Sequence, residues 1–159
     1  MEKGSWAECM DLIATAELVC EDKEGLIWAH LCNTAGIVEY ERGNAERSYP
    51  YMNKSREIRE RLLPENHMDV SDVLNNYGNL LMTDSESGTS LASALELYQR
   101  AANIDNAAPQ GERVLHIRHI NIGAVYTFQG QYDLAVTHYE LARKYAIATF
   151  GKGRHFDGR

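Results

Sequence analysis

The stretch that decides the fold is His119–Ala142, HINIGAVYTFQGQYDLAVTHYELA. Small residues at Gly123, Ala135 and Ala142 recur at helical spacing and allow two backbones to approach closely. Tyrosines are interleaved with them, and Gly130 separates the two amphipathic segments. The stretch therefore predicts a pair of antiparallel helices. Such a hairpin cannot bury both of its faces alone, so it should occur more than once.

The hairpin does recur along the chain. Gly36, Gly78 and Gly123 mark the first helix of three successive units and lie 42 and 45 residues apart. The second helices repeat the small-residue pattern, and the polar turn Asp84–Gly88 absorbs extra residues in the second unit. A repeat of this length predicts an all-α solenoid, in which each hairpin packs against its neighbours.

We expect one domain, residues 1–159, divided as follows: a half repeat at 4–21, repeats at 26–63, 68–105 and 112–150, and the start of a further repeat at 151–159. The half repeat lacks its own first helix, and His155 in the tail stands where His67 stands just before the second unit. We therefore expect a segment of a longer protein. Asp69 or Ser71 should cap the helix that follows the break at Pro64.

At these positions the chain resembles the tetratricopeptide repeat family, in its longer, kinesin light chain-like form. The third unit carries most of the pattern, at Gly123, Tyr126, Gly130, Tyr132, Ala135, Tyr139 and Ala142. The other two match at Gly78, Ala94, Tyr98 and Ala101, and at Gly36 and Gly43. The stretch LPENHMDVSDVLNNYGNLL also resembles repeats of fungal multidomain, nucleotide-binding receptor-like proteins. The resemblance implies a right-handed superhelical solenoid of about seven helices that binds other proteins.

Composition excludes several other classes. The net charge of −7 disfavours a nucleic-acid surface, which needs clustered Lys and Arg. The sequence contains no apolar run long enough to span a membrane and no signal peptide. The three cysteines are odd in number and have no Cys-x-x-Cys spacing, which indicates a reducing, cytoplasmic location.

Residues with catalytic or metal-binding chemistry are sparse. His116 and His119, three residues apart, and nearby Tyr126 are the titratable cluster that an enzyme could use. We interpret them as ordinary surface or packing residues and predict no catalytic residue, no metal site and no cofactor. An enzyme that uses the solenoid's concavity is kept as a third class of function. The recurrence of His67 and His155 indicates a structural role in the turn.

Asparagine is the residue type that needs an explanation. Five asparagines lie in the predicted first helices: Asn33, Asn75, Asn76, Asn79 and Asn121. Asparagine is a poor helix former, so its presence at five positions in these helices needs a reason other than helix propensity. In tetratricopeptide proteins the first helices line the concave face, where carboxamides can bind the backbone of an extended peptide. The resemblance therefore implies the following peptide-contact residues: Asn33, Asn75, Asn79, Asn76, Asn121, Tyr40, Met82, Ile120 and Thr127.

Alternatives remain open at two levels. Some asparagines, Asn76 and Asn121 above all, could instead connect neighbouring repeats. The family's clamp for a C-terminal carboxylate uses Lys and Arg on the first helices, and none lies beside Asn75 and Asn79. We therefore predict a non-enzymatic scaffold for a neutral or mixed peptide. The alternative function is a self-association module that oligomerises a larger receptor-type protein through its end repeats.

Overall fold

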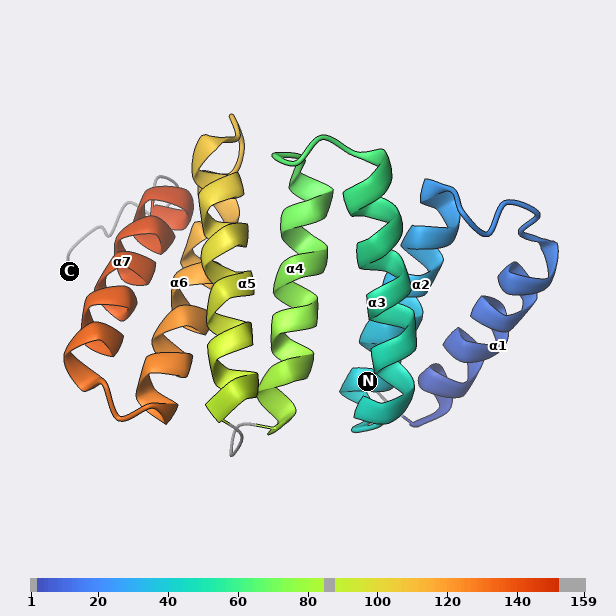
Figure 1. The fold of residues 1–159 in the computed structure, drawn as a ribbon, viewed down its shortest axis with the longest axis horizontal. Coiled ribbons are helices and arrows are strands. Elements are labelled where there is room, and N and C mark those ends of the chain that lie inside the picture. The colour runs from blue at the N-terminus through green and yellow to red at the C-terminus, as the bar shows by residue number, and fades with distance from the viewer. Residues whose placement is uncertain (1–2, 85–87, 152–159) are drawn as a thin grey trace, which may run out of the picture.

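The computed structural model describes residues 3–84 and 88–151. These residues form seven α-helices and one short 3-10 helix, with no strand among them. The helices are α1 (Lys3–Val19), α2 (Leu26–Glu41), α3 (Ala45–Leu62), α4 (Met68–Leu81), η1 (Met82–Asp84), α5 (Gly88–Ala107), α6 (Glu112–Phe128) and α7 (Tyr132–Phe150). They follow one another across the molecule, with α1 and α7 at opposite ends (Figure 1). The chain is an all-α solenoid, as the sequence predicts.

Three helical hairpins build the solenoid. The most extensive contacts join α2 with α3, α4 with α5, and α6 with α7, and α1 packs on α2. Gly43 and Gly130 follow the first helices of two hairpins with positive φ angles of 78° and 72°. Only glycine adopts this left-handed conformation at little cost, which explains why both turns carry it. Nearly all contacts join neighbouring elements, so each repeat depends on the next one for burial.

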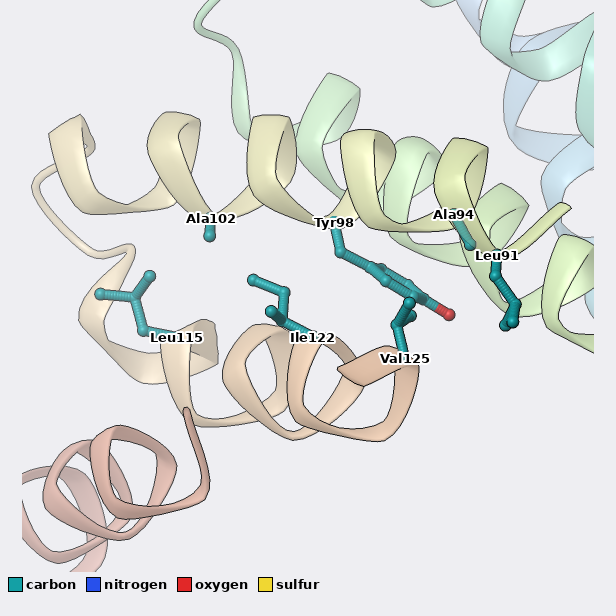
Figure 2. Close-up of a cluster of buried hydrophobic side chains, with 7 residues drawn as sticks. All are labelled: Leu91, Ala94, Tyr98, Ala102, Leu115, Ile122 and Val125. Atoms are coloured by element: carbon teal, nitrogen blue, oxygen red, sulfur yellow. The ribbon is translucent and has the colours of Figure 1, made fainter. Parts of the chain in front are cut away.

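The hydrophobic core runs along the solenoid as a series of clusters between neighbouring helices. The cluster between α5 and α6 consists of Leu91, Ala94, Tyr98, Ala102, Leu115, Ile122 and Val125 (Figure 2). Met52 on α3 packs with Tyr77 and Leu80 on α4 at the preceding junction. These clusters bury the apolar stripe of each helix and hold the first helices in a row.

Helix α1 is attached by a smaller cluster. Its Ile13 packs with Ala35 and Val38 of α2. By contrast, Leu18 and Val19 at the end of α1 are 88% and 73% exposed. This end of the solenoid therefore presents apolar surface.

The start of α4 differs from the expectation. Neither Asp69 nor Ser71 caps it: the cap is His67, whose Nδ1 accepts the backbone N–H of Asp69 at 3.1 Å. Ser71 lies one turn too deep, and its hydroxyl donates instead to the carbonyl of Ala101 at 3.1 Å. His67 thus has a structural role in the turn. His155 and the predicted start of a further repeat after Gly151 lie outside the described residues.

Candidate functional site

Asparagine side chains connect the first helices of the three hairpins. Asn76 on α4 donates its amide to the side-chain oxygen of Asn33 on α2 at 3.3 Å. Asn121 on α6 donates to Asn75 at 2.8 Å and to Asn79 at 3.3 Å, both on α4. We call these five residues the asparagine ladder. The ladder crosses both junctions between neighbouring hairpins.

A tyrosine from the second helices fixes one member of the ladder. The hydroxyl of Tyr98 on α5 donates to the side-chain oxygen of Asn79 at 2.8 Å. The Tyr98 side chain is buried, and this burial raises the pKa of its hydroxyl above the ordinary value. Tyr98 is therefore a neutral hydrogen-bond donor at physiological pH, and it holds the Asn79 oxygen in one orientation.

The ladder leaves part of its hydrogen-bonding capacity for another molecule. In the hydrogen bonds of the described residues, the side chains of Asn33, Asn75 and Asn79 only accept. Those of Asn76 and Asn121 only donate. Each carboxamide has two N–H groups and an oxygen with two lone pairs. Asn33 and Asn75 are buried, whereas Asn76, Asn79 and Asn121 are half-buried and form the accessible part.

The other predicted contact residues lie in different surroundings. Tyr40 packs against the core between α3 and α4, and Met82 packs against the core between α5 and α6. Ile120 on α6 is 47% exposed. The exposed Thr127 donates its hydroxyl to the carbonyl of Gly123 at 2.9 Å. The structure thus brings the asparagines together, while the contact of all nine residues with a peptide stays a prediction.

A buried charge cluster lies at the junction between the second and third hairpins. It was not predicted from the sequence. Arg118 on α6 donates from Nε to Asp105 on α5 at 2.7 Å. One terminal nitrogen donates to Asp72 on α4 at 2.6 Å and to the hydroxyl of Ser71 at 3.3 Å. Arg118 and Asp105 are 3% and 1% exposed, whereas Asp72 is exposed. The guanidinium therefore ties α4, α5 and α6 together.

The sequence did contain a signal for this cluster. Arg118 shares a helical stripe with Leu115 and Ile122, and both of these residues are buried. An arginine on a buried stripe needs an anion beside it, because an unpaired buried charge is very costly. Its partners lie 13 and 46 residues away in the chain, so they could not be named without the fold. The cluster stabilises the junction on which the ladder lies.

The three residues considered for an enzyme do not all meet at one place. The ring of His116 packs edge-on against Phe150, whereas His119 stacks on Tyr145. Tyr126 packs against His138, which also contacts His119, so His119 and Tyr126 meet at His138. The trio is therefore distributed along the seam between α6 and α7.

The described residues also bear on whether the protein has a metal site, a membrane span or a pocket. They contain no group of three or more His, Cys, Asp or Glu side chains that could hold a metal ion. None of their helices has the length and apolar character needed to cross a membrane. A pocket of about 970 Å³ lies where the end of α1 meets the start of α2, and its apolar walls include Val19, Leu26 and Ile27.

Comparison with known proteins bears on the fold. No family model and no curated protein matches the chain. Among solved structures it is similar to BtubC (BKLC) from P. vanneervenii, a kinesin light chain-like protein, with a TM-score of 0.71 and 24% sequence identity. The match covers 97% of this chain and 58% of BtubC, so the chain spans little more than half the length of that protein. The chain therefore has a helical repeat fold.

Proposed function

We propose that this protein is a non-enzymatic interaction scaffold that binds an extended peptide or partner segment along the asparagine ladder. The observation that carries the proposal is the row of carboxamides from three successive first helices. Because carboxamides both donate and accept, such a row can pair with a peptide backbone of any sequence. Exposed Ile117 and Ile120 on α6 add apolar contacts that select among side chains.

The proposed partner is a protein segment of neutral or mixed charge. No Lys or Arg lies beside Asn75 or Asn79 in the sequence, and Arg118 at the same junction is already paired with Asp72 and Asp105, so it does not serve a terminal carboxylate. The net charge of −7 disfavours nucleic acid as a partner. Free cysteines at Cys9, Cys20 and Cys32 support a reducing location such as the cytoplasm.

The proposed family is that of kinesin light chain-like tetratricopeptide repeats. The likeness to BtubC supports this assignment at the level of the fold. The narrower relation, to repeats of fungal multidomain receptor-like proteins, rests on the LPENHMDVSDVLNNYGNLL stretch and stays a prediction. The division of the domain into a half repeat and three repeats stays a prediction as well.

The peptide-binding proposal is tested by selecting binders from a displayed library of random peptides. Peptides that are enriched on the full chain should lose about tenfold in affinity for Ile120→Ala, because truncation removes an exposed apolar contact beside the ladder. The control is Ile147→Ala, which removes a similarly exposed isoleucine from α7. Affinities are measured by calorimetry. Failure to enrich any peptide, or equal losses for both variants, would contradict the proposal.

Self-association is the alternative function, and a separate observation favours it. Both ends of the solenoid expose apolar side chains: Leu12, Leu18 and Val19 on α1, and Val136, Ile147 and Phe150 on α7. Exposed apolar surface of this kind is typical of interaction sites. Pairing of the end hairpins would oligomerise a larger protein that contains this domain.

Light scattering across a wide concentration range tests the alternative. If α1 pairs between chains, the molar mass of the wild type rises with concentration, while Leu18→Glu combined with Val19→Glu stays monomeric. The charges would have to be buried unpaired in the interface, which is costly. Leu62→Glu, which alters an exposed leucine on α3, serves as the control and should associate like the wild type. A wild type that is monomeric at every concentration would dismiss this alternative.

A further inference from the structure

A pair of histidines bridges the two helices of the last hairpin. Nδ1 of His119 on α6 lies 3.0 Å from Nδ1 of His138 on α7, and the ring centroids are 5.2 Å apart. Tyr145 stacks on His119 with its ring plane tilted by 5°, and Tyr126 packs against His138. The two tyrosines thus hold the two imidazoles with their Nδ1 atoms facing each other across the seam. Both histidines are half-buried.

The repeat shows that the fold does not need histidine at these places. The second and third hairpins can be aligned by placing Gly78 on Gly123 and Tyr98 on Tyr139. In this alignment His119 takes the place of Leu74, and His138 takes the place of Leu97. Leu74 is buried and Leu97 is partly buried in the core between α4 and α5. An aliphatic pair therefore closes an equivalent seam. Two imidazoles in place of this aliphatic pair carry a desolvation cost, so packing alone does not explain why histidine stands at both positions.

The separation of the two nitrogens matches that of adjacent ligands on a metal ion. With metal–nitrogen bonds of about 2.0–2.1 Å, two imidazole nitrogens lie about 2.9 Å apart at a right angle and about 3.4 Å apart at a tetrahedral angle. The observed 3.0 Å lies between these values and close to the first. We propose that His119 and His138 form a two-histidine chelate for a divalent transition-metal ion.

The geometry favours Cu²⁺ or Ni²⁺ over Zn²⁺. Right-angle coordination by nitrogen is typical of square-planar and tetragonal Cu²⁺ and Ni²⁺ sites, and the intrinsic affinity of imidazole sites is highest for Cu²⁺. The described residues contribute two ligands, because they include no larger group of metal-binding side chains. Water or a donor group from a bound partner completes the coordination.

The proton balance of binding is simple. The two facing Nδ1 atoms share one N–H in the hydrogen-bonded pair. When the metal binds, that proton is exchanged through solvent to Nε2 of the same ring, and both Nδ1 lone pairs face the ion. Burial lowers the pKa of both histidines, and the charge of His138 contributes further at His119, so both rings are neutral near pH 7 without metal. Binding at that pH releases no net proton.

Calorimetric titration of the full chain with CuCl₂, NiCl₂ and ZnCl₂ tests the proposal. One ion should bind per chain, most tightly Cu²⁺, and His119→Gln or His138→Gln should each abolish this binding. His30→Gln, which removes an exposed histidine of α2, is the matched control and should bind like the wild type. Electron paramagnetic resonance of the Cu²⁺ complex should show coupling to two nitrogens. Unchanged binding in His119→Gln or His138→Gln would overturn the proposal.

Thermal unfolding gives a second readout that does not depend on the stability of the glutamine variants. Metal at about a hundredfold excess over Kd should raise the wild-type Tm by roughly 5–10 °C, because it binds only the folded hairpin. His119→Leu combined with His138→Leu restores the aliphatic pair of the second hairpin. This variant should fold and show no shift with metal. A full shift in it would place the metal elsewhere and refute the chelate.

Discussion

Replacing Arg118 by alanine should lower the free energy of unfolding by about 3–5 kcal/mol. The substitution removes the cation that lies 2.7 Å from Asp105, and that carboxylate is 1% exposed. Its Oδ1 already has no hydrogen-bond partner among the described residues. The variant would therefore bury an unpaired charge between α5 and α6. Urea denaturation followed by circular dichroism measures the loss.

The control is Arg113→Ala, which removes an exposed arginine from the same helix and should change stability by less than about 0.5 kcal/mol. A second variant separates the ion pair from the packing. Arg118→Met combined with Asp105→Leu replaces both charges by apolar groups, and it should be much more stable than Arg118→Ala. A loss below about 1 kcal/mol for Arg118→Ala would show that the pair is not buried as described.

The same variant should also weaken coupling between repeats. Arg118 contacts Asp72 on α4 as well as Asp105 on α5, so it joins the second and third hairpins. In a solenoid the interfaces between repeats make unfolding cooperative. We expect the denaturation curve of Arg118→Ala to broaden, with the α6–α7 hairpin unfolding first.

Replacing Gly78 by alanine should destabilise the protein by about 1–3 kcal/mol, even though alanine is the better helix former by about 1 kcal/mol. The new Cβ would lie 2.6 Å from Cε1 of Tyr98, a distance that requires the ring to move. The ring cannot move freely, because it is 2% exposed and its hydroxyl is bonded to Asn79. Overpacking therefore outweighs the gain in helix propensity.

The third hairpin provides a matched comparison. In Gly123→Ala the Cβ would lie 2.7 Å from Cε1 of Tyr139, nearly the same contact. Tyr139, however, is 41% exposed and can rotate away into solvent. We expect Gly123→Ala to have stability within about 1 kcal/mol of the wild type, because the propensity gain offsets a small rearrangement. Equal losses for both variants in urea denaturation would contradict this explanation.

Most of the fold could be predicted because its information is local and repeated. The glycines of the first helices and the turns at Gly43 and Gly130 locate the hairpins, and helical spacing in Glu112–Phe128 and Tyr132–Phe150 identifies the last pair. The helix cap was not predictable in the same way. His67, Asp69 and Ser71 can each cap a helix start, and a shift of two residues in that start decides which of them is the N-cap; here it is His67, whose Nδ1 accepts the N–H of Asp69.

The candidate site could be predicted in part. Asparagines in first helices signal a polar row, but a sequence cannot show whether a carboxamide pairs with a peptide or with another asparagine. The structure shows that Asn121 bonds to Asn75 and Asn79, and that Asn33 bonds to Asn76. The connector alternative therefore describes part of their role, while the half-buried members keep capacity for a peptide.

By itself, the sequence determined an all-α solenoid. Small residues at helical spacing and glycines in the turns specify each hairpin through local interactions, and the same pattern occurs in three successive units. Only the tertiary structure decided which distant side chains meet. His119 pairs with His138 across the seam instead of with His116 one turn away, and Arg118 reaches Asp105 and Asp72 on two other helices. Such contacts depend on how helices of different repeats are placed, and that placement arises from packing of the whole core.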